Sequence, residues 1–532
     1  MDDLYRLDLY GWLILASLCF LQIAMTSIPG KFGSWFGLSV LGLASFCTLC
    51  NVLTLGIFKS PVTFIALSTA IQSNTHEVTE FLATYGTQFA LSGGIAVSLS
   101  VILIGLYVVS QRPRTHQKAA MSLMLSFLCS MPVLYQSRGD LNLFARNVHE
   151  HAFVDRLFTS LIRYQGIMEA REKAKVFWSQ RRHGKEPLKL DSASHKPKPQ
   201  LVVVVIGEST SRNHLGIYGY HRPTTPRLES MKDQLLVFRD AISPVASTLP
   251  AVFGALCSSQ FDYETFECGG PTLLEIAQAA GYKTTWISNQ APTGFGDNFL
   301  VELGRTADTA IFVNQDISSA GEADHSSSFD EKVLGPLDKV IQSTLQHGQQ
   351  SMFFLHLMGT HFVYEKRYPR DQRMFQNTHD LKIPATVKDP HANDMINHYD
   401  NAVAYQDRIL GEIMGRINTS GKDALLVYFS DHGEEVYDTD NFAGHSEDRV
   451  TPSMREIPFI VGYSPSYARH TSELNRIRTY ANRPFSTFQL TPSVAGLLGL
   501  YSDAFSQQDN VFSEDFQPTR GAMSAERKAS RP

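Results

Sequence analysis

The distribution of apolar residues along the chain constrains its fold more than any other feature of the sequence. Residues 1–136 hold long apolar runs, whereas residues 138–532 have the mixed composition of a globular protein. The runs Leu9–Ser27, Trp35–Phe58 and Phe89–Val109 are each long enough to cross the ~30 Å hydrocarbon layer of a membrane at about 1.5 Å per residue. The sequence therefore predicts a membrane unit followed by a globular unit.

Two further apolar runs set the expected number of membrane spans. Ala119–Gln136 is borderline in length but almost uncharged, and Pro61–Ser73 reaches the length of a span only with the polar residues that follow it. We therefore expect five transmembrane helices, or four if the shorter run does not cross. A cleaved signal peptide fits poorly, because Met1–Tyr10 is acidic and further apolar runs follow.

A short basic loop sets the expected orientation of the membrane unit. Gln111–Lys118 carries Arg112, Arg114 and Lys118, and the positive-inside rule places such a loop in the cytoplasm. Only one predicted span follows the loop. Everything after Ser137 is therefore expected on the opposite face of the membrane, which in a Gram-negative cell is the periplasm.

The globular unit alternates between short apolar runs and helical stretches. The runs suit buried, mostly parallel strands and lie at 201–206, 283–288, 352–357, 424–429 and 458–463. With helices such as 401–417 between them, they predict an α/β sheet covered by helices on both faces. The formal net charge of −5 points to no nucleic-acid partner.

Changes of composition give the expected domain boundaries. We expect a transmembrane domain at 1–137, an amphipathic bridging helix and linker at 138–200, the α/β domain at 201–508 and a polar tail at 509–532. Cys257 and Cys268 lie in the α/β domain, eleven positions apart, and in an oxidising compartment they can close a small loop. Two free thiols are the alternative.

Two of the predicted strands run into residue types that bind metals. The strand at 201–206 is followed by Glu208, and the strand at 424–429 is followed by Asp431 and His432. Functional residues of open α/β sheets gather at the carboxyl ends of strands, so these three side chains are expected to meet. Two carboxylates and an imidazole suit zinc with one position left open, although an Asp-His-Gly sequence after a strand is often only a turn.

Four segments give the chain a specific resemblance to a known family. They are VIGESTSRNHLGIYGYHRPTTPRL (205–228), HLMGTHFVYEKRYP (356–369), YDNAVAYQD (399–407) and YFSDHGEEVYDT (428–439). In this order they resemble the phosphoethanolamine transferases of Gram-negative envelopes, which belong to the alkaline phosphatase/sulfatase superfamily. The runs HGEEVYDT (432–439) and NTHEVTEFL (74–82) are most similar to the branch that modifies the lipopolysaccharide core rather than lipid A. The resemblance implies a sulfatase-like periplasmic domain.

The resemblance also implies a metal site with a covalent nucleophile. It implies zinc bound by Glu208, Asp431, His432 and a threonine, for which Thr248 in the segment ASTLPA is the candidate. Metal coordination lowers the pKa of a hydroxyl and neutralises charge on phosphoryl oxygens, so a threonine beside zinc can act as a nucleophile. Ser247 is adjacent, and the alternative role for Thr248 is to cap the helix that is expected to follow.

Two histidines and an acidic segment complete the implied site. The resemblance implies that His361 and His445 contact the phosphoryl group, protonate the leaving group or hold a second metal ion; a solvent-exposed loop histidine is the alternative for His445. Asn74 and Glu77 are implied to receive the zwitterionic headgroup of the donor lipid, with Glu77 or Glu80 facing its ammonium group. An ordinary exterior loop is the alternative for this segment.

The implied reaction moves phosphoethanolamine from phosphatidylethanolamine to lipopolysaccharide through a phosphothreonine. Core heptose is favoured as the acceptor, and heptose phosphate, lipid A phosphate and periplasmic glucan remain open. A phosphoglycerol transferase of the same superfamily and an inactive membrane scaffold are the alternatives. A sulfatase activity fits poorly, because Cys257 is followed by SSQF and lacks the Pro and Arg of a Cys-x-Pro-x-Arg motif.

Overall fold

The computed structural model describes the globular part of the chain in most detail. The described residues are 198–259, 261–262, 267–290, 299–314, 329–377, 379–447 and 450–519, the segments 176–181 and 188–191, and a few positions between 50 and 98. The chain divides into two compact units, Met1–Met168 and Glu169–Pro532. Among the described helices, none has the length and hydropathy that a membrane crossing requires. The predicted spans lie almost entirely outside the described residues, and so do the basic loop, Asn74 and Glu77.

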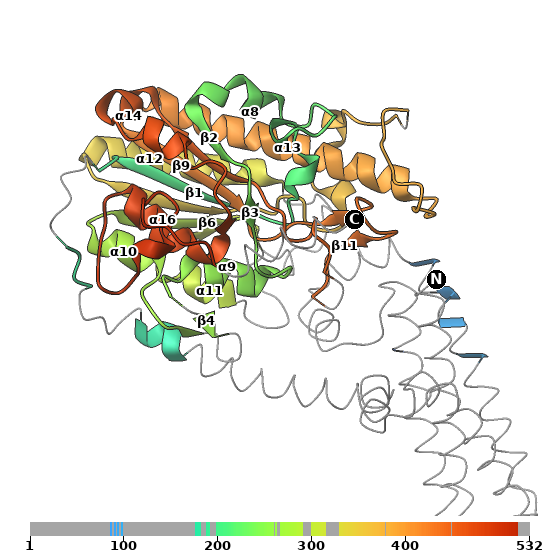
Figure 1. Ribbon diagram of the computed structural model, residues 1–532, viewed down its shortest axis with the longest axis horizontal. Helices are drawn as coiled ribbons and strands as arrows, with labels where there is room; N and C mark the ends of the chain where they lie inside the picture. Colours follow the sequence, from blue (N-terminus) through green and yellow to red (C-terminus); the bar gives the residue numbers. More distant parts are fainter. Residues whose placement is uncertain are drawn as a thin grey trace, which may run out of the picture. The chain divides into compact units, whose positions relative to one another are not determined.

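A seven-stranded sheet forms the centre of the second unit, in the order β2-β12-β9-β1-β8-β6-β7 (Figure 1). The strands are β1 (Leu201–Gly207), β2 (Leu235–Phe238), β6 (Lys283–Ser288), β7 (Thr309–Phe312), β8 (Ser351–His356), β9 (Ala424–Ser430) and β12 (Phe459–Tyr463). The five strands from β9 to β7 are parallel, and β12 is antiparallel to both of its neighbours. All five predicted runs lie in this sheet, so the predicted α/β domain is confirmed.

The central strand shows why the sequence favours this arrangement. All seven residues of β1 (LVVVVIG) are buried, and β-branched valines suit a strand that is covered on both faces. On one face, Val203 and Val205 share a core cluster with Leu337 of one covering helix and Ile409 and Ile413 of another. This packing fixes the position and direction of β1 in the sheet, and therefore the place where the strand ends.

Helices cover both faces of the sheet (Figure 1). In Figure 1, α8 (Pro226–Ser230), α12 (Leu334–His347), α13 (Ala392–Thr419) and α14 (Pro465–His470) lie above the sheet. Below it lie α9 (Thr248–Leu256), α10 (Leu273–Ala279), α11 (Phe299–Gly304) and α16 (Leu490–Leu497). The remaining elements are short: α15 (Leu474–Arg478), β3 (Ala241–Ile242), β4 (Phe261–Asp262), β5 (Glu267–Cys268), β10 (Glu435–Val436), β11 (Ala443–Gly444) and β13 (Phe485–Ser486).

Residues 510–519, the described part of the stretch expected to be a polar tail, include side chains packed against the domain. Val511 and Phe512 are buried, and the ring of Phe512 lies edge-on to that of Phe238 with a centroid distance of 5.6 Å. Arg483 donates a hydrogen bond to the carbonyl of Val511. These contacts join the segment to β2 at the edge of the sheet.

Candidate metal centre

The ends of two neighbouring strands bring the three predicted metal ligands together. Gly207 at the end of β1 pairs with Ser430 at the end of β9, so Glu208 and Asp431 leave the sheet side by side. Nε2 of His432 lies 3.4 Å from Oε1 of Glu208 and 3.4 Å from Oδ2 of Asp431. All three side chains are buried, and one ligand atom from each lies within 4.8 Å of the others. This geometry can hold a metal ion.

Thr248 points its hydroxyl at the same cluster. Oγ1 of Thr248 donates a hydrogen bond to Oε1 of Glu208 at 3.1 Å and lies 3.3 Å from Nε2 of His432. Helix α9 begins at Thr248 itself, ahead of Pro250, and the residue at its N-cap is Ser247, whose side chain makes no capping bond. The Thr248 hydroxyl therefore faces the candidate ligands from the positive end of a helix, where an anion is favoured.

The buried donor atoms fit a cation. Oε2 of Glu208 and Oδ2 of Asp431 are buried and make no hydrogen bond within the described part of the chain. Burial and the charge of Glu208 raise the pKa of Asp431 to about 8. Burial lowers the pKa of His432, but Asp431 and Glu208 outweigh this effect and raise it to about 10. One of two carboxyl groups this close in a buried site, here Asp431, retains its proton unless a cation neutralises the pair. Two oxygens with an imidazole nitrogen and a hydroxyl suit tetrahedral zinc.

Backbone contacts fix the orientation of the ligands. Oδ1 of Asp431 accepts hydrogen bonds from the backbone N–H groups of Ser209, at 3.0 Å, and His432, at 2.6 Å. Nδ1 of His432 lies 2.8 Å from the carbonyl of Gly433, which leaves Nε2 directed at the site. A side chain at Gly433 would meet the carbonyl oxygen of Ser453 at 2.1 Å, so the glycine of the Asp-His-Gly motif is needed for a close approach of two backbones.

A strained turn follows Glu208 and is held by one tyrosine. Ser209 has a φ of 57°, a left-handed conformation that is uncommon for residues other than glycine. The buried hydroxyl of Tyr399 on α13 donates to the carbonyl of Ser209 at 2.8 Å and accepts from the N–H of Ser211 at 2.8 Å. Tyr399 is the first residue of YDNAVAYQD, a segment that carries the family resemblance but predicts no role for this tyrosine at the site.

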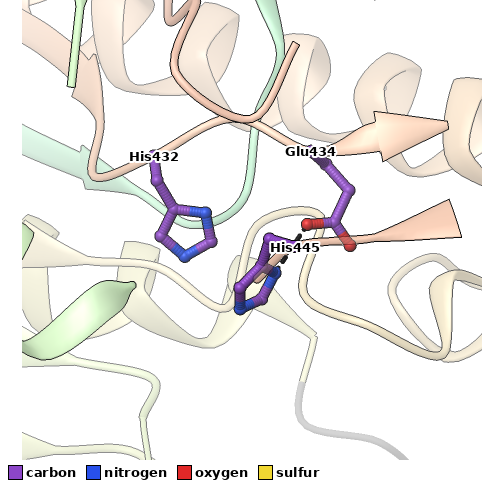
Figure 2. Close-up of side chains that lie close together, drawn as sticks. All are labelled: His432, Glu434 and His445. Atoms are coloured by element: carbon purple, nitrogen blue, oxygen red, sulfur yellow. Dashed lines mark hydrogen bonds and ion pairs between the residues drawn. The ribbon is translucent and has the colours of Figure 1, made fainter. Parts of the chain in front are cut away.

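A second group of possible ligands adjoins the first. Figure 2 shows the side chains of His432, Glu434 and His445 converging, and one ligand atom from each lies within 4.8 Å of the others. Nδ1 of His445 is 2.7 Å from Oε2 of Glu434, and the rings of His445 and His432 have centroids 4.2 Å apart. His445 therefore lies at the site rather than in a solvent-exposed loop. Glu434 is fully buried, and the sequence marks it only as part of the segment HGEEVYDT.

His361 and an unpredicted histidine lie near Glu208. Burial alone would raise the pKa of Glu208, but the hydrogen bond to His432 and the charges of His432 and His361 lower it below its ordinary value. His361 is partly buried in the loop after β8, whereas His356 ends that strand and is almost fully buried. Burial lowers the pKa of His356 to about 4, so it is neutral at physiological pH.

The loop that carries His361 is held by a buried carboxylate. Asp330 accepts hydrogen bonds from the N–H groups of Met358, at 2.8 Å, and Gly359, at 2.9 Å. Burial raises the pKa of Asp330. No motif in the sequence marks Asp330, because its partners, these two backbone groups and the side-chain amide of Asn289, lie far from it in the chain.

The two cysteines of the globular unit form a disulfide. Cys257 and Cys268 are bonded, with their Cα atoms 5.7 Å apart. Cys257 comes directly after Leu256, the last residue of α9. The disulfide therefore ties down the end of the helix that begins with Thr248.

Comparison with known proteins agrees with the fold and the site. The model of the sulfatase family matches residues 200–500, which is more than half of the chain. The chain therefore belongs to the sulfatase family, and the resemblance drawn from the motifs is confirmed at this level.

The relatives within this family give a narrower comparison. The chain is 30% identical over 328 residues to phosphoethanolamine transferase EptC of Escherichia coli K12, which covers 60% of this chain and 55% of the relative. It thus spans about half the length of the curated relatives it matches. The crystal structure of the periplasmic domain of E. coli EptC in complex with Zn matches with a TM-score of 0.57 and 29% identity, over 63% of this chain and 92% of that domain.

A longer match shows likeness of fold alone. The integral membrane protein lipooligosaccharide phosphoethanolamine transferase A (EptA) from Neisseria meningitidis matches with a TM-score of 0.63 at 19% identity. It covers 96% of this chain and 98% of that protein.

Proposed function

We propose that this chain transfers phosphoethanolamine from phosphatidylethanolamine to a lipopolysaccharide acceptor, with core heptose favoured over lipid A. The observation that carries the proposal is the Thr248 hydroxyl, which lies within hydrogen-bonding distance of both Glu208 and His432 at the start of α9. The relatives named phosphoethanolamine transferases support the choice of transferred group.

The same residues define the chemistry of the proposed first step. Zinc held by Glu208, Asp431, His432 and Thr248 would lower the pKa of the threonine hydroxyl and neutralise charge on the phosphoryl oxygens. Oγ1 of Thr248 attacks the phosphorus of the donor, and the bond from phosphorus to the glycerol oxygen breaks. Thr248 gives up its hydroxyl proton in this attack, and the departing glycerol oxygen takes up one proton, with His361 and His445 as the predicted carriers. Phosphoethanolamine is then held on Thr248 as a phosphodiester.

In the second step, Thr248 becomes the leaving group and the acceptor becomes the nucleophile at the same phosphorus. A hydroxyl or phosphate oxygen of the acceptor attacks, the bond to Oγ1 of Thr248 breaks, and the threonine recovers its proton. A lipid donor requires access to a membrane surface. We therefore place the chain in the Gram-negative inner membrane, with its catalytic domain in the periplasm and with Asn74 and Glu77 at the donor headgroup.

Trapping the intermediate tests the proposal directly. Full-length protein loaded with zinc is incubated with phosphatidylethanolamine and without an acceptor, and intact mass and peptide mapping locate any phosphoethanolamine adduct. We expect the adduct on Thr248, no adduct in Thr248→Ala, and a normal adduct in the control Ser247→Ala. An adduct formed from phosphatidylglycerol and not from phosphatidylethanolamine would favour the phosphoglycerol transferase alternative. Transfer of phosphoethanolamine to the acceptor at the wild-type rate by Thr248→Ala would contradict the mechanism.

A further inference from the structure

A short segment ahead of the first strand is built into the catalytic domain. Residues 176–181 are helical and end twenty positions before β1 (201 − 181), within the stretch that the sequence assigns to a bridging helix and linker. In Figure 1 they form the short teal helix near β4. Trp178 has none of its surface exposed, whereas Val176, two positions earlier, is 55% exposed. The buried face of the segment therefore includes Trp178.

Trp178 packs against the helix that carries the candidate nucleophile. Its ring lies with a centroid distance of 5.4 Å from that of Phe253 in α9, which in turn stacks on Phe261 at 5.2 Å. Phe253 follows Thr248 by five positions (253 − 248), or about 7.5 Å along the helix axis. Trp178 thus supports α9 from the side, one and a half turns from its first residue.

Arg181 fastens the segment to the same region. Its Nε lies 3.1 Å from Oε1 of Glu275, and its other nitrogens donate to the carbonyls of Cys268, at 3.2 Å, and Gly270, at 2.6 Å. The guanidinium carbon also lies 5.6 Å from the centre of the Trp178 ring. Cys268 is bonded to Cys257, which directly follows α9. Arg181 and the disulfide therefore connect the segment 176–181 to the end of this helix.

We propose that Trp178 is a positioning residue for Thr248, in the reaction proposed above, and that Arg181 anchors it. Removing the indole leaves a cavity beside Phe253, and neighbouring structure relaxes partly into such cavities. Helix α9 is short and stiff, so a shift at Phe253 moves Thr248 with it. The Thr248 hydroxyl must keep its contacts with Glu208 and His432, and a displacement of about 1 Å can slow a reaction roughly 100-fold.

The test uses the full-length, zinc-loaded protein and distinguishes an effect of Trp178 on the position of Thr248 from an effect on the stability of the fold. Trp178→Ala is compared with Trp178→Phe and with a matched control, Phe512→Ala, which removes a buried ring from the far edge of the sheet. The readouts are the thermal midpoint, the bound zinc and the rate at which Thr248 acquires phosphoethanolamine. We expect both alanine variants to be less stable and to keep their zinc. Only Trp178→Ala should form the adduct about 10- to 100-fold more slowly, and Trp178→Phe should recover most of the rate.

Equal rates of adduct formation in folded Trp178→Ala and Phe512→Ala would overturn the positioning role. If Trp178→Ala does not fold, Trp178→Leu and Arg181→Gln are compared with Phe512→Ala instead, because they remove less of the packing around α9. A wild-type chain that never forms an adduct on Thr248 contradicts the proposed function itself. A wild-type chain that forms the adduct no faster than the folded Trp178 variants contradicts only the inference about Trp178.

Discussion

At the scale of single residues, one hydroxyl group holds the turn that presents Glu208. The hydroxyl of Tyr399 serves both the carbonyl of Ser209 and the N–H of Ser211, each at 2.8 Å, in a fully buried setting. Such outer contacts orient metal ligands, and their loss commonly weakens metal binding by about 10- to 100-fold. The left-handed Ser209 makes the turn more dependent on this support than a relaxed turn would be.

We therefore expect Tyr399→Phe to weaken zinc binding by about 10-fold or more. Two buried backbone groups lose their partner, so the free energy of unfolding should also fall by about 1–3 kcal/mol. Zinc affinity is measured by competition with a chromophoric chelator. The matched control is Tyr463→Phe, whose hydroxyl donates to the carbonyl of Asp233 at 2.6 Å, away from the site. Unchanged zinc affinity in Tyr399→Phe would show that the turn holds its shape without this contact.

At the scale of elements, a buried ion cluster joins the loop after β1 to α13. Nδ1 of His214 lies 2.7 Å from Asp400 on α13, and its Nε2 lies 3.3 Å from Asp438. Arg222 pairs with the other oxygen of Asp400 at 2.7 Å. Burial lowers the pKa of His214, but Asp438 and Asp400 outweigh this effect and raise it to about 10.

This raised pKa gives a defined dependence of stability on pH. A histidine whose pKa is higher in the folded than in the unfolded state binds its proton more tightly when folded. Its contribution is therefore complete below about pH 6.5 and is lost as the pH rises through about 10. We expect the difference in unfolding free energy between wild type and His214→Asn to be largest in acid and to shrink across this window. Urea unfolding of the zinc-loaded proteins measures it, and a difference that is constant with pH would contradict a charged His214.

The strands and the residues around the site differ in how far the sequence alone could predict them. The strands and the cluster of candidate ligands at their ends were predictable, because apolar runs and the residues that follow them are local features. Only the family resemblance singles out Thr248 as the candidate nucleophile. Its local sequence looks like that of any threonine at the start of a helix. Tyr399 and Asp330 act through backbone groups more than twenty positions away, so no spacing in the sequence marks them. The sequence places Trp178 in the expected bridging helix but gives it no partner, because Phe253 becomes its neighbour only in the folded domain.

At the scale of the whole molecule, the candidate metal ligands follow the central strand of the sheet, β1, and its neighbour β9. Glu208 extends β1 and Asp431 extends β9, and β1 pairs with β8 on its other side. Two buried carboxylates in contact repel each other when ionised, whereas a bound cation turns the same cluster into a link between strands. The metal is thus expected to stabilise the catalytic domain as well as to serve the reaction.

Metal removal should therefore lower the thermal midpoint of the second unit as a whole. A site filled at about 100 times its dissociation constant adds about 2.7 kcal/mol to the free energy of unfolding, a shift of several degrees. The measurement is thermal unfolding of the full-length protein before chelation, after chelation and after zinc is restored. Glu208→Gln is the matched control, because it keeps the shape of the side chain while removing one anionic ligand, and its midpoint should hardly respond to zinc. If chelation leaves the wild-type midpoint unchanged although bound zinc has been lost, the cluster contributes nothing to the stability of the sheet, and its role is confined to the chemistry at Thr248.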